Sequence, residues 1–289
     1  MYYSIRKCMM LDTNIGNKYH ITKLLGNGKF GIVYQGNIIK NGEIVAIKTE
    51  KTDLKYKMLK HEVTILNYLF RNHCKLIPFI YWYGVHFNHT CIIMTYYSHS
   101  LQDYFNSKGI VDTSKLCSIM IKCIDILESI HKYFVIHRDI KPQNFMIKNG
   151  EIYLIDFGLA TFYIDEDNKH ISKFNNEYVI GTPKYMSYYN HHGDPCSRRD
   201  DLISLGYMYL YLQTGNLPWD NIQMPTNDEK TDYNETHVLH PKNQIRKQYK
   251  AWSHLSCGLH SNIKNYLKYC YELSYDETPL YDTMMNLFV

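Results

Sequence analysis

Apolar and polar positions follow two different periods along this chain, and the period changes near residue 97. Before that point, apolar runs of strand length are separated by Gly, Asn and other polar residues, which predicts β-strands. One stretch differs, because Met58, Ile65, Leu66 and Leu69 recur at helix spacing. The pattern predicts a five-stranded antiparallel sheet with one main helix. The expected strands are residues 18–25, the run that follows Gly31, and residues 45–48, 79–84 and 91–97.

Beyond residue 98 the apolar positions follow helix periodicity, so the fold class is α+β with a mainly helical second part. Residues 201–214 are apolar nearly all round, which is typical of a helix buried inside a lobe. Residues 221–241 are polar and irregular and predict a loop, after which two or three helices close the chain. A continuous stripe predicts one more structural helix: Leu116, Ile119, Met120, Cys123, Ile124, Leu127 and Ile130.

Chemistry-bearing residues gather around a predicted hairpin. The strand-like runs 145–148 and 151–155 are joined by Asn149-Gly150, the dipeptide that best tolerates the positive φ angles of a two-residue turn. We expect the hairpin to return Asp156 to the loop that carries Asp139 and Asn144. An aspartate within reach of a hydroxyl, with an amide and a second aspartate to hold Mg²⁺, is the set that phosphoryl transfer needs.

A second group of candidates lies near the start of the chain. Gly26, Gly28 and Gly31 would allow backbone N–H groups to approach phosphate oxygens without a Cβ in the way. Three glycines at this spacing arise by chance in about one chain in ten, so the run is weak alone. The strand that ends in Lys48 follows it closely, and Glu62, near the inward face of the predicted helix, is the expected partner of that ammonium group.

Composition narrows the class of protein. The chain has 289 residues, 45% of them hydrophobic and 21% charged, which excludes wholesale disorder and suits one large domain or two modest ones. The net charge of +4, without any long run of like charges, does not predict strong nucleic-acid binding. No apolar stretch is long enough to span a bilayer, so no membrane partner is expected. Heavy use of Tyr, Ile, Asn and Lys is typical of AT-rich genomes, such as those of some viruses and protists.

Eight cysteines without a C-x-x-C pair predict reduced thiols and an intracellular location, cytoplasmic or nuclear, inside the host cell if the source is a virus. His86, His89 and Cys91 suggest either a metal site or the tip of a hairpin. The hairpin is favoured, because no complete set of metal ligands accompanies them.

Three motifs resemble those of the eukaryotic protein kinases: H-R-D-x-x-x-x-N at 137–144, D-F-G at 156–158 and V-A-I-K at 45–48. The resemblance implies a bilobal fold with a short arm at 1–16, an N-lobe at 17–97 and a C-lobe at 98–289, the kinase domain being 17–289. It also implies ATP and Mg²⁺ as cofactors and proteins as substrates. Asp201 would fix the backbone of the turn at 137–138.

The same resemblance assigns roles to the candidates. Asp139 would accept the hydroxyl proton, Lys141 would neutralise the transferring phosphoryl group, and Asn144 and Asp156 would hold the metal. Lys48 would pair the α and β phosphates, with Glu62 holding it in place. The remaining expected ATP-binding residues are Leu25, Gly26, Gly28, Gly31, Val33, Ala46, Met94, Thr95, Tyr97, Met146 and Ile155.

Within the kinases, the chain is similar to the casein kinase 1 family from about residue 15 to its end. It lacks A-P-E but has G-T-P-K-Y-M-S at 181–187, S-R-R-D-D-L at 197–202 and L-P-W at 217–219. The resemblance implies a monomeric serine/threonine kinase that is active without an activating phosphate. It also implies a basic anion site, for which Lys184 and Arg138 are the candidates. Glu177, where relatives carry a basic residue, puts a preference for acidic or phosphorylated targets in doubt.

Two other interpretations compete with an active protein kinase. One is a catalytically weak scaffold or binding protein, which would normally have lost Lys48, Asp139 or Asp156, and none is missing. The other is a small-molecule phosphotransferase, which would lack the segments 181–187 and 197–202. Transfer of labelled phosphate from ATP to casein separates all three.

Overall fold

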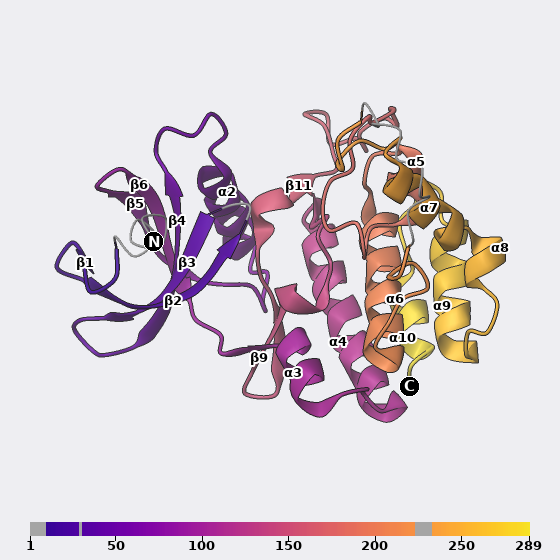
Figure 1. The fold of residues 1–289 in the computed structure, drawn as a ribbon, viewed down its shortest axis with the longest axis horizontal. Coiled ribbons are helices and arrows are strands. Elements are labelled where there is room, and N and C mark those ends of the chain that lie inside the picture. Colours follow the sequence, from indigo (N-terminus) through magenta and orange to yellow (C-terminus); the bar gives the residue numbers. More distant parts are fainter. Residues whose placement is uncertain (1–9, 29–30, 223–232) are drawn as a thin grey trace. The chain divides into compact units, whose positions relative to one another are not determined.

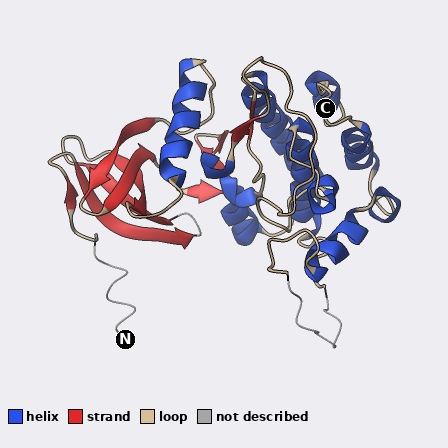
Figure 2. Ribbon diagram, turned by 90° about the horizontal axis from the view of Figure 1, so that it is seen from above, coloured by secondary structure: helices blue, strands red, loops and turns tan. Residues whose placement is uncertain are grey.

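A computed structural model describes residues 10–28, 31–222 and 233–289. The chain forms two compact units, which Figures 1 and 2 show as ribbons. The first unit runs to Ser98 and also includes Ile155–Gly158, and the second contains His99–Leu154 and Leu159–Val289. Strands dominate the first unit and helices dominate the second (Figure 2).

The first unit is built on one antiparallel sheet of six strands in the order β1-β2-β3-β4-β6-β5. Five of these strands match the predicted ones, so the expected count was one strand too low. The missed strand, β1, has only two residues and is too short to show any periodicity. The strands are β1 (Asn14–Ile15), β2 (Tyr19–Gly28), β3 (Gly31–Ile38), β4 (Ile44–Lys51), β5 (Ile80–His86) and β6 (His89–Thr95).

Burial explains why β1 forms. Ile15 pairs with Tyr19 of β2, and both side chains are buried together with Met10 in the core of the sheet. Residues 10–16 therefore pack on the sheet, although they were expected in the N-terminal arm. The rest of that expected arm, residues 1–9, lies outside the described residues.

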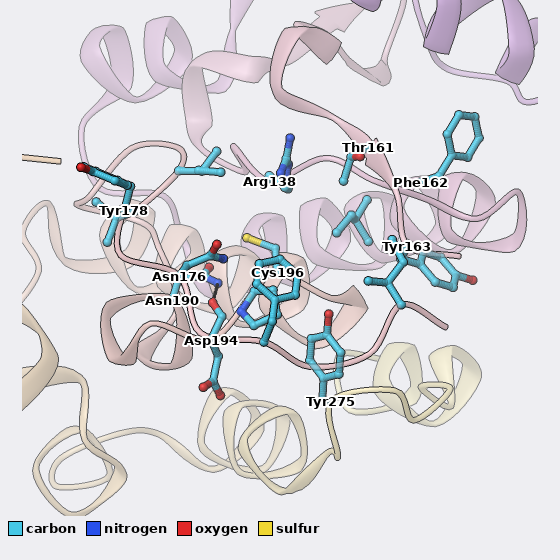
Figure 3. A pocket seen from close by; sticks show the side chains of 16 residues that line it. Arg138, Thr161, Phe162, Tyr163, Asn176, Tyr178, Asn190, Asp194, Cys196 and Tyr275 are labelled. Carbon is cyan, nitrogen blue, oxygen red and sulfur yellow. Dashed lines mark hydrogen bonds between the residues drawn. The ribbon is translucent and has the colours of Figure 1, made fainter. Parts of the chain in front are cut away.

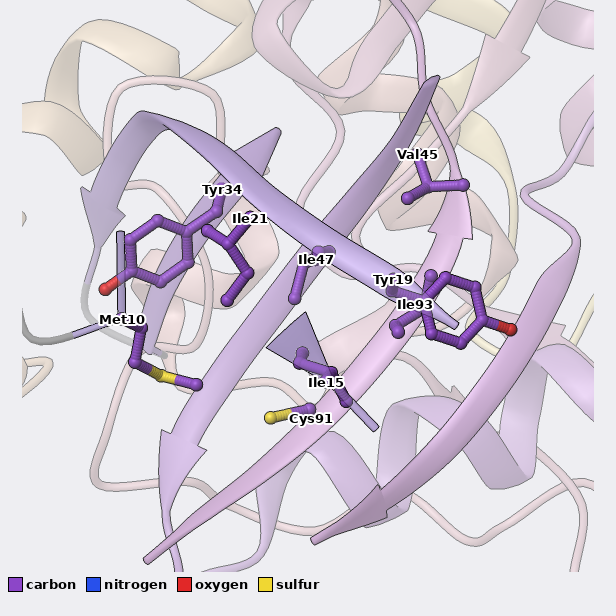
Figure 4. Packing of buried hydrophobic residues seen from close by; sticks show 9 residues of the cluster. All are labelled: Met10, Ile15, Tyr19, Ile21, Tyr34, Val45, Ile47, Cys91 and Ile93. Carbon is purple, nitrogen blue, oxygen red and sulfur yellow. The ribbon is translucent and has the colours of Figure 1, made fainter. Parts of the chain in front are cut away.

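The two faces of β4 serve different purposes, because successive side chains of a strand point to opposite sides. Val45 and Ile47 point into the apolar cluster shown in Figure 4, among Tyr34, Cys91 and Ile93. On the other face, Ala46 and Lys48 share a side with helix α2 (Met58–Arg71). The amphipathic character of α2 was predicted correctly. At the start of α2, the Leu59 amide donates a hydrogen bond to the Glu50 carboxylate (3.1 Å).

Strand β5 forms one edge of the sheet and pairs with β6. His86 of β5 faces His89 of β6 as the last pair of this ladder. The sequence prediction of a hairpin tip at this place is confirmed.

The second unit is mainly helical. Helix α6 (Arg198–Thr214) is buried along almost its whole length, as its pattern predicted, and lies between α4 (Thr113–Lys132) and α9 (Ser261–Glu272) (Figure 1). Shorter helices complete the unit: α3 (Leu101–Lys108), α5 (Tyr188–His192), α7 (Pro241–Lys250), α8 (Trp252–Leu255) and α10 (Tyr281–Asn286). Met284 and Phe288 are buried and dock α10.

The predicted hairpin of the second unit is present. Strands β9 (Phe145–Lys148) and β10 (Glu151–Leu154) pair in register, and Asn149 and Gly150 between them have φ angles of 54° and 80°. Two positive φ angles in a two-residue loop match the right-handed twist of the strands. Small strands complete the unit: β7 (His99–Ser100) beside β9, and β8 (Val135–Ile136) paired with β11 (Thr161–Phe162).

The polar loop predicted at 221–241 is described only in part, because residues 223–232 lie outside the described residues. Residues 234–240 follow a sequence of turns that ends at the start of α7. None of the helices in the described parts of the chain is both long and apolar enough to cross a membrane.

Candidate active site

In the first unit, three candidate residues meet around one ammonium group. Lys48 Nζ lies 2.7 Å from Glu62 Oε2 and 2.6 Å from Asp156 Oδ1. Burial alone would lower the pKa of Lys48, but the negative charges of Glu62 and Asp156 outweigh burial and raise it. Lys48 therefore stays a cation, held between two carboxylates. The pairing of Lys48 with Glu62 predicted from the sequence is confirmed.

Secondary structure fixes each member of this group. Lys48 projects from β4 on the side of α2, and Glu62, only 1% exposed, projects from α2. Burial raises the pKa of Glu62, and the nearby Lys48 cation opposes that rise. Asp156 has a φ of 66°, a left-handed conformation that is uncommon for residues other than glycine. The chain therefore leaves the extended conformation of β10 at Asp156, and the Asp156 carboxylate lies beside Lys48.

The glycine run lies where β2 turns into β3. Gly26 pairs with Val33 and Gly28 with Gly31, while Lys29 and Phe30 lie outside the described residues. Gly31 has a φ of 129°, and a Cβ there would lie 2.2 Å from the backbone oxygen of Thr49. Only glycine fits this approach of β3 to β4, so at least this glycine has a structural requirement.

The other candidates of the first unit follow the sheet register. Val33 lies opposite Lys48, and Ala46 lies opposite Met94. The Thr95 amide donates to the carbonyl of Phe79 (3.0 Å). The remaining candidates divide between the units: Leu25, Tyr97 and Ile155 lie in the first, and Met146 lies on β9 of the second.

In the second unit, the carboxylate of Asp139 is surrounded by hydrogen-bond donors. Lys141 Nζ lies 2.6 Å from Asp139 Oδ2, and Thr182 Oγ1 donates to Asp139 Oδ1 (2.6 Å). Lys141 also donates to Thr182 (3.0 Å), so the three side chains form a closed triangle. The amide of Asn144 donates to the backbone oxygen of Asp139 (2.8 Å), which holds Asn144 beside the carboxylate.

The buried carboxylate of Asp201 holds the backbone of the loop that carries Asp139. The carboxylate of Asp201 accepts hydrogen bonds from the amides of His137 (2.7 Å) and Arg138 (2.9 Å), as the sequence predicted. The ring of His131 lies 3.1 Å from the same carboxylate and 2.7 Å from the hydroxyl of Tyr281. Burial alone would raise the pKa of Asp201, but the hydrogen bond and charge of His131 lower it.

The approach of Thr182 to Asp139 depends on Gly181. Its φ is 110°, and a Cβ there would lie 2.4 Å from the carbonyl oxygen of Arg138. A larger residue would push the segment away from the loop that carries Arg138 and Asp139. The sequence analysis did not foresee the bond from Thr182 to Asp139.

The two residues expected to bind an anion have different surroundings. Arg138 donates through Nε to the backbone of Leu159 (2.5 Å) and lines a cavity of about 180 Å³ beneath the segment 161–180, shown in Figure 3. Lys184 does not line this cavity. It forms an ion pair with Asp220 (2.7 Å), a partner that the sequence analysis missed, and lies 4.1 Å from the ring centre of Tyr211.

The two residues expected to hold Mg²⁺ lie in different units, Asn144 in the second and Asp156 in the first. The Asn144 amide nitrogen is used by Asp139, which orients the side chain so that its oxygen can serve as a ligand. The Asp156 side chain is 29% exposed and therefore reachable. Carboxylate and amide oxygens are ligands that Mg²⁺ prefers, so each of the two side chains carries a donor that fits this metal.

Comparison with known protein families gives a match that covers most of the chain. The model of the protein kinase domain family matches residues 19–278, which takes in most of both units.

Proposed function

The chain belongs to the protein kinase domain family, and from this premise we propose that it transfers the γ-phosphoryl group of ATP to serine and threonine hydroxyls of proteins, as casein kinase 1 does. The observation that carries the proposal is the hydrogen-bonded triangle of Asp139, Lys141 and Thr182. A carboxylate that accepts from a hydroxyl at 2.6 Å is suited to accept from a substrate hydroxyl as well.

We assign nucleotide binding to the first unit. Lys48, kept charged by Glu62, would neutralise the α and β phosphates, and Gly26 and Gly28 would let backbone amides approach them. Because the Thr95 amide is already bonded to Phe79, Thr95 would contact adenine through its carbonyl. In this proposal residues 17–97 form the nucleotide-binding lobe and residues 98–289 the lobe that binds protein. The apolar walls of the adenine site would be Leu25, Val33, Ala46, Met94, Met146 and Ile155, with Tyr97 and Gly31 beside them.

Mg²⁺ would be held by Asn144 and Asp156, and when bound it would neutralise charge on the phosphates. The protein residues have separate tasks. Asp139 orients the attacking hydroxyl and accepts its proton. Lys141, 2.6 Å from Asp139, supplies positive charge where the phosphoryl group passes.

Incubation of the pure protein with labelled Mg·ATP and casein tests this function. We expect label in casein, recovered as phosphoserine and phosphothreonine after acid hydrolysis. Label recovered mainly as phosphotyrosine would overturn the assigned specificity. Absence of transfer by protein that binds Mg·ATP would favour the scaffold interpretation instead.

A further inference from the structure

The turn that follows Thr182 is held from behind by buried side chains. Three of its backbone carbonyls accept hydrogen bonds from distant parts of the second unit. Lys250 Nζ donates to Pro183 (2.9 Å) and to Met186 (2.6 Å), and Trp219 Nε1 donates to Lys184 (2.7 Å). The peptide backbone of residues 183–186 is therefore fixed by side-chain donors rather than by regular secondary structure.

Lys250 is an unusual donor, because it is fully buried at the end of α7. Its ammonium group lies 4.7 Å from the ring centre of Trp219, 5.1 Å from that of Tyr207 and 3.2 Å from His191 Nε2. In the parts of the chain that the structure describes, Lys250 forms no ion pair with a carboxylate. Two backbone carbonyls and one imidazole nitrogen therefore lie within hydrogen-bond distance of Lys250 Nζ.

Burying an amine is costly, and an apolar side chain would fill the same space at lower cost. Burial lowers the pKa of Lys250, and the positive charge of Arg246 acts in the same direction. The backbone of Lys250 is itself anchored, since Tyr271 donates to its carbonyl (2.7 Å). The amine is thus held in place by hydrogen bonds at a point where an apolar side chain could pack.

We propose that Lys250 is a positioning residue, which fixes the turn 182–186 so that Thr182 and the peptide-facing backbone are preorganised for the protein substrate. Thr182 begins this turn and also bonds to Asp139 and Lys141, so a shift of the turn reaches the reacting groups. The inference deepens the proposed kinase function and rests on it.

The main test is Lys250→Met, which keeps the length of the side chain but removes its hydrogen-bond donors. We expect kcat/KM for a peptide substrate to fall about 10- to 100-fold through a higher peptide KM, because small displacements of positioning groups have effects of this size. Affinity for Mg·ATP should stay within about two-fold, since the nucleotide-binding residues proposed above, such as Lys48, are not bonded to Lys250. A purely structural role would instead lower the melting temperature and the active fraction, with peptide KM unchanged, and would overturn the proposal.

Two further variants complete the test. Lys247→Met, on the same helix, is the matched control and should leave peptide KM unchanged, because none of the bonds to residues 183–186 involves Lys247. Trp219→Phe keeps an aromatic ring but removes the donor to Lys184, and it should raise peptide KM in the same direction. If Lys250→Met does not fold, Trp219→Phe decides, and an unchanged peptide KM in that variant contradicts the inference. A wild-type protein that transfers no phosphate refutes the proposed function itself, which is a separate outcome.

Discussion

In the first unit, the buried positive charge of Lys48 is stabilised by two neighbouring carboxylates. Lys48 is 9% exposed and remains an ammonium group only because Glu62 and Asp156 lie within 2.7 Å. Each of the three would be costly to bury alone, so the group is stable as a set. In the proposed function, this arrangement would present one fixed positive charge to the nucleotide.

Replacing Lys48 by Met should lower kcat by at least about 1,000-fold, because it removes charge stabilisation that matters most in the transition state. The fold should be retained, since Glu62 then takes up a proton and is no longer an unpaired charge. Asp156→Asn should have an effect of similar size. Lys51→Met, on the exposed end of the same strand, is the control. Single-turnover kinetics with saturating Mg·ATP would measure the effect, and turnover near that of the wild type would remove Lys48 from the site.

Another residue pair bears on substrate choice. Lys184 is paired with Asp220, whose carboxylate also accepts from the Leu217 amide (2.8 Å), and Glu177 is exposed nearby in sequence. A phosphate on a substrate would have to displace Asp220 to reach Lys184. We therefore expect a weak preference for peptides with an upstream phosphoserine.

Asp220→Asn should raise that preference, because it leaves the Lys184 charge available to the substrate. The measurement is kcat/KM for peptide pairs that carry phosphoserine or alanine upstream of the target. We expect a ratio of about 1.5 to 5 in the variant relative to the wild type, the size of one exposed charge pair. A strong primed preference in the wild type, unchanged by Asp220→Asn or Glu177→Lys, would show that the anion is read elsewhere.

At the scale of elements, the segment after D-F-G is ordered by contacts with the chain before α7. Val179 donates to the Thr236 carbonyl (2.8 Å), and Val238 donates to the Glu177 carbonyl (2.8 Å), which gives a short antiparallel ladder. Asn243 of α7 in turn holds the carbonyl of His237 (3.0 Å). Backbone pairing thus supplies an ordering interaction that many kinases obtain from a phosphate.

We therefore predict that the protein is active without phosphorylation of this segment. Protein made in bacteria should keep its activity within about two-fold after phosphatase treatment, and Ser172→Ala should do the same, because no phosphate switch is needed. Ser172 is exposed, whereas Thr161 and Thr182 are half-buried and Thr182 is bonded to Asp139. Loss of most activity in both experiments would demonstrate a phosphate switch at this position.

Helices, strands and turns were predictable from the sequence where their pattern lies within a few neighbouring residues. The Asn149-Gly150 turn, the stripe of α4 and the alternation of β4 each lie within a few residues, so their patterns are complete in the sequence. The structure adds what depends on distant partners. Asp220 is 36 residues from Lys184 and Lys250 is 67 from Pro183, and neither pairing leaves a trace in periodicity. Lys250 lies on a mostly polar helix, where a lysine is normally exposed to water.

At the scale of the whole molecule, stability depends on buried histidines. The chain has 15 histidines, and His131, His137 and His191 are each at most 1% exposed. Burial lowers the pKa of His131 despite the opposing effect of Asp201, and burial together with the Lys250 charge lowers that of His191. Both rings therefore bind a proton more weakly in the folded chain than in the unfolded chain.

The last prediction is that the free energy of unfolding falls as the pH drops below about 6.5, the ordinary pKa of histidine. Between the lowered pKa of the folded state and 6.5 the unfolded chain binds more protons, so stability is complete above 6.5 and is lost on acidification. Each of the two histidines should contribute at most about 1.4 kcal/mol per pH unit.

Urea unfolding between pH 7.5 and 5.5 measures this slope. His131→Gln and His191→Gln should each reduce it, whereas His254→Gln, at an exposed position, should not. Glu62 and Asp200, whose pKa values are raised by burial, act in the opposite sense. Because His131 also lowers the pKa of Asp201, His191→Gln compared with His254→Gln gives the more direct measure of one histidine. An equal slope in all four proteins would mean that neither buried ring gains a proton on unfolding.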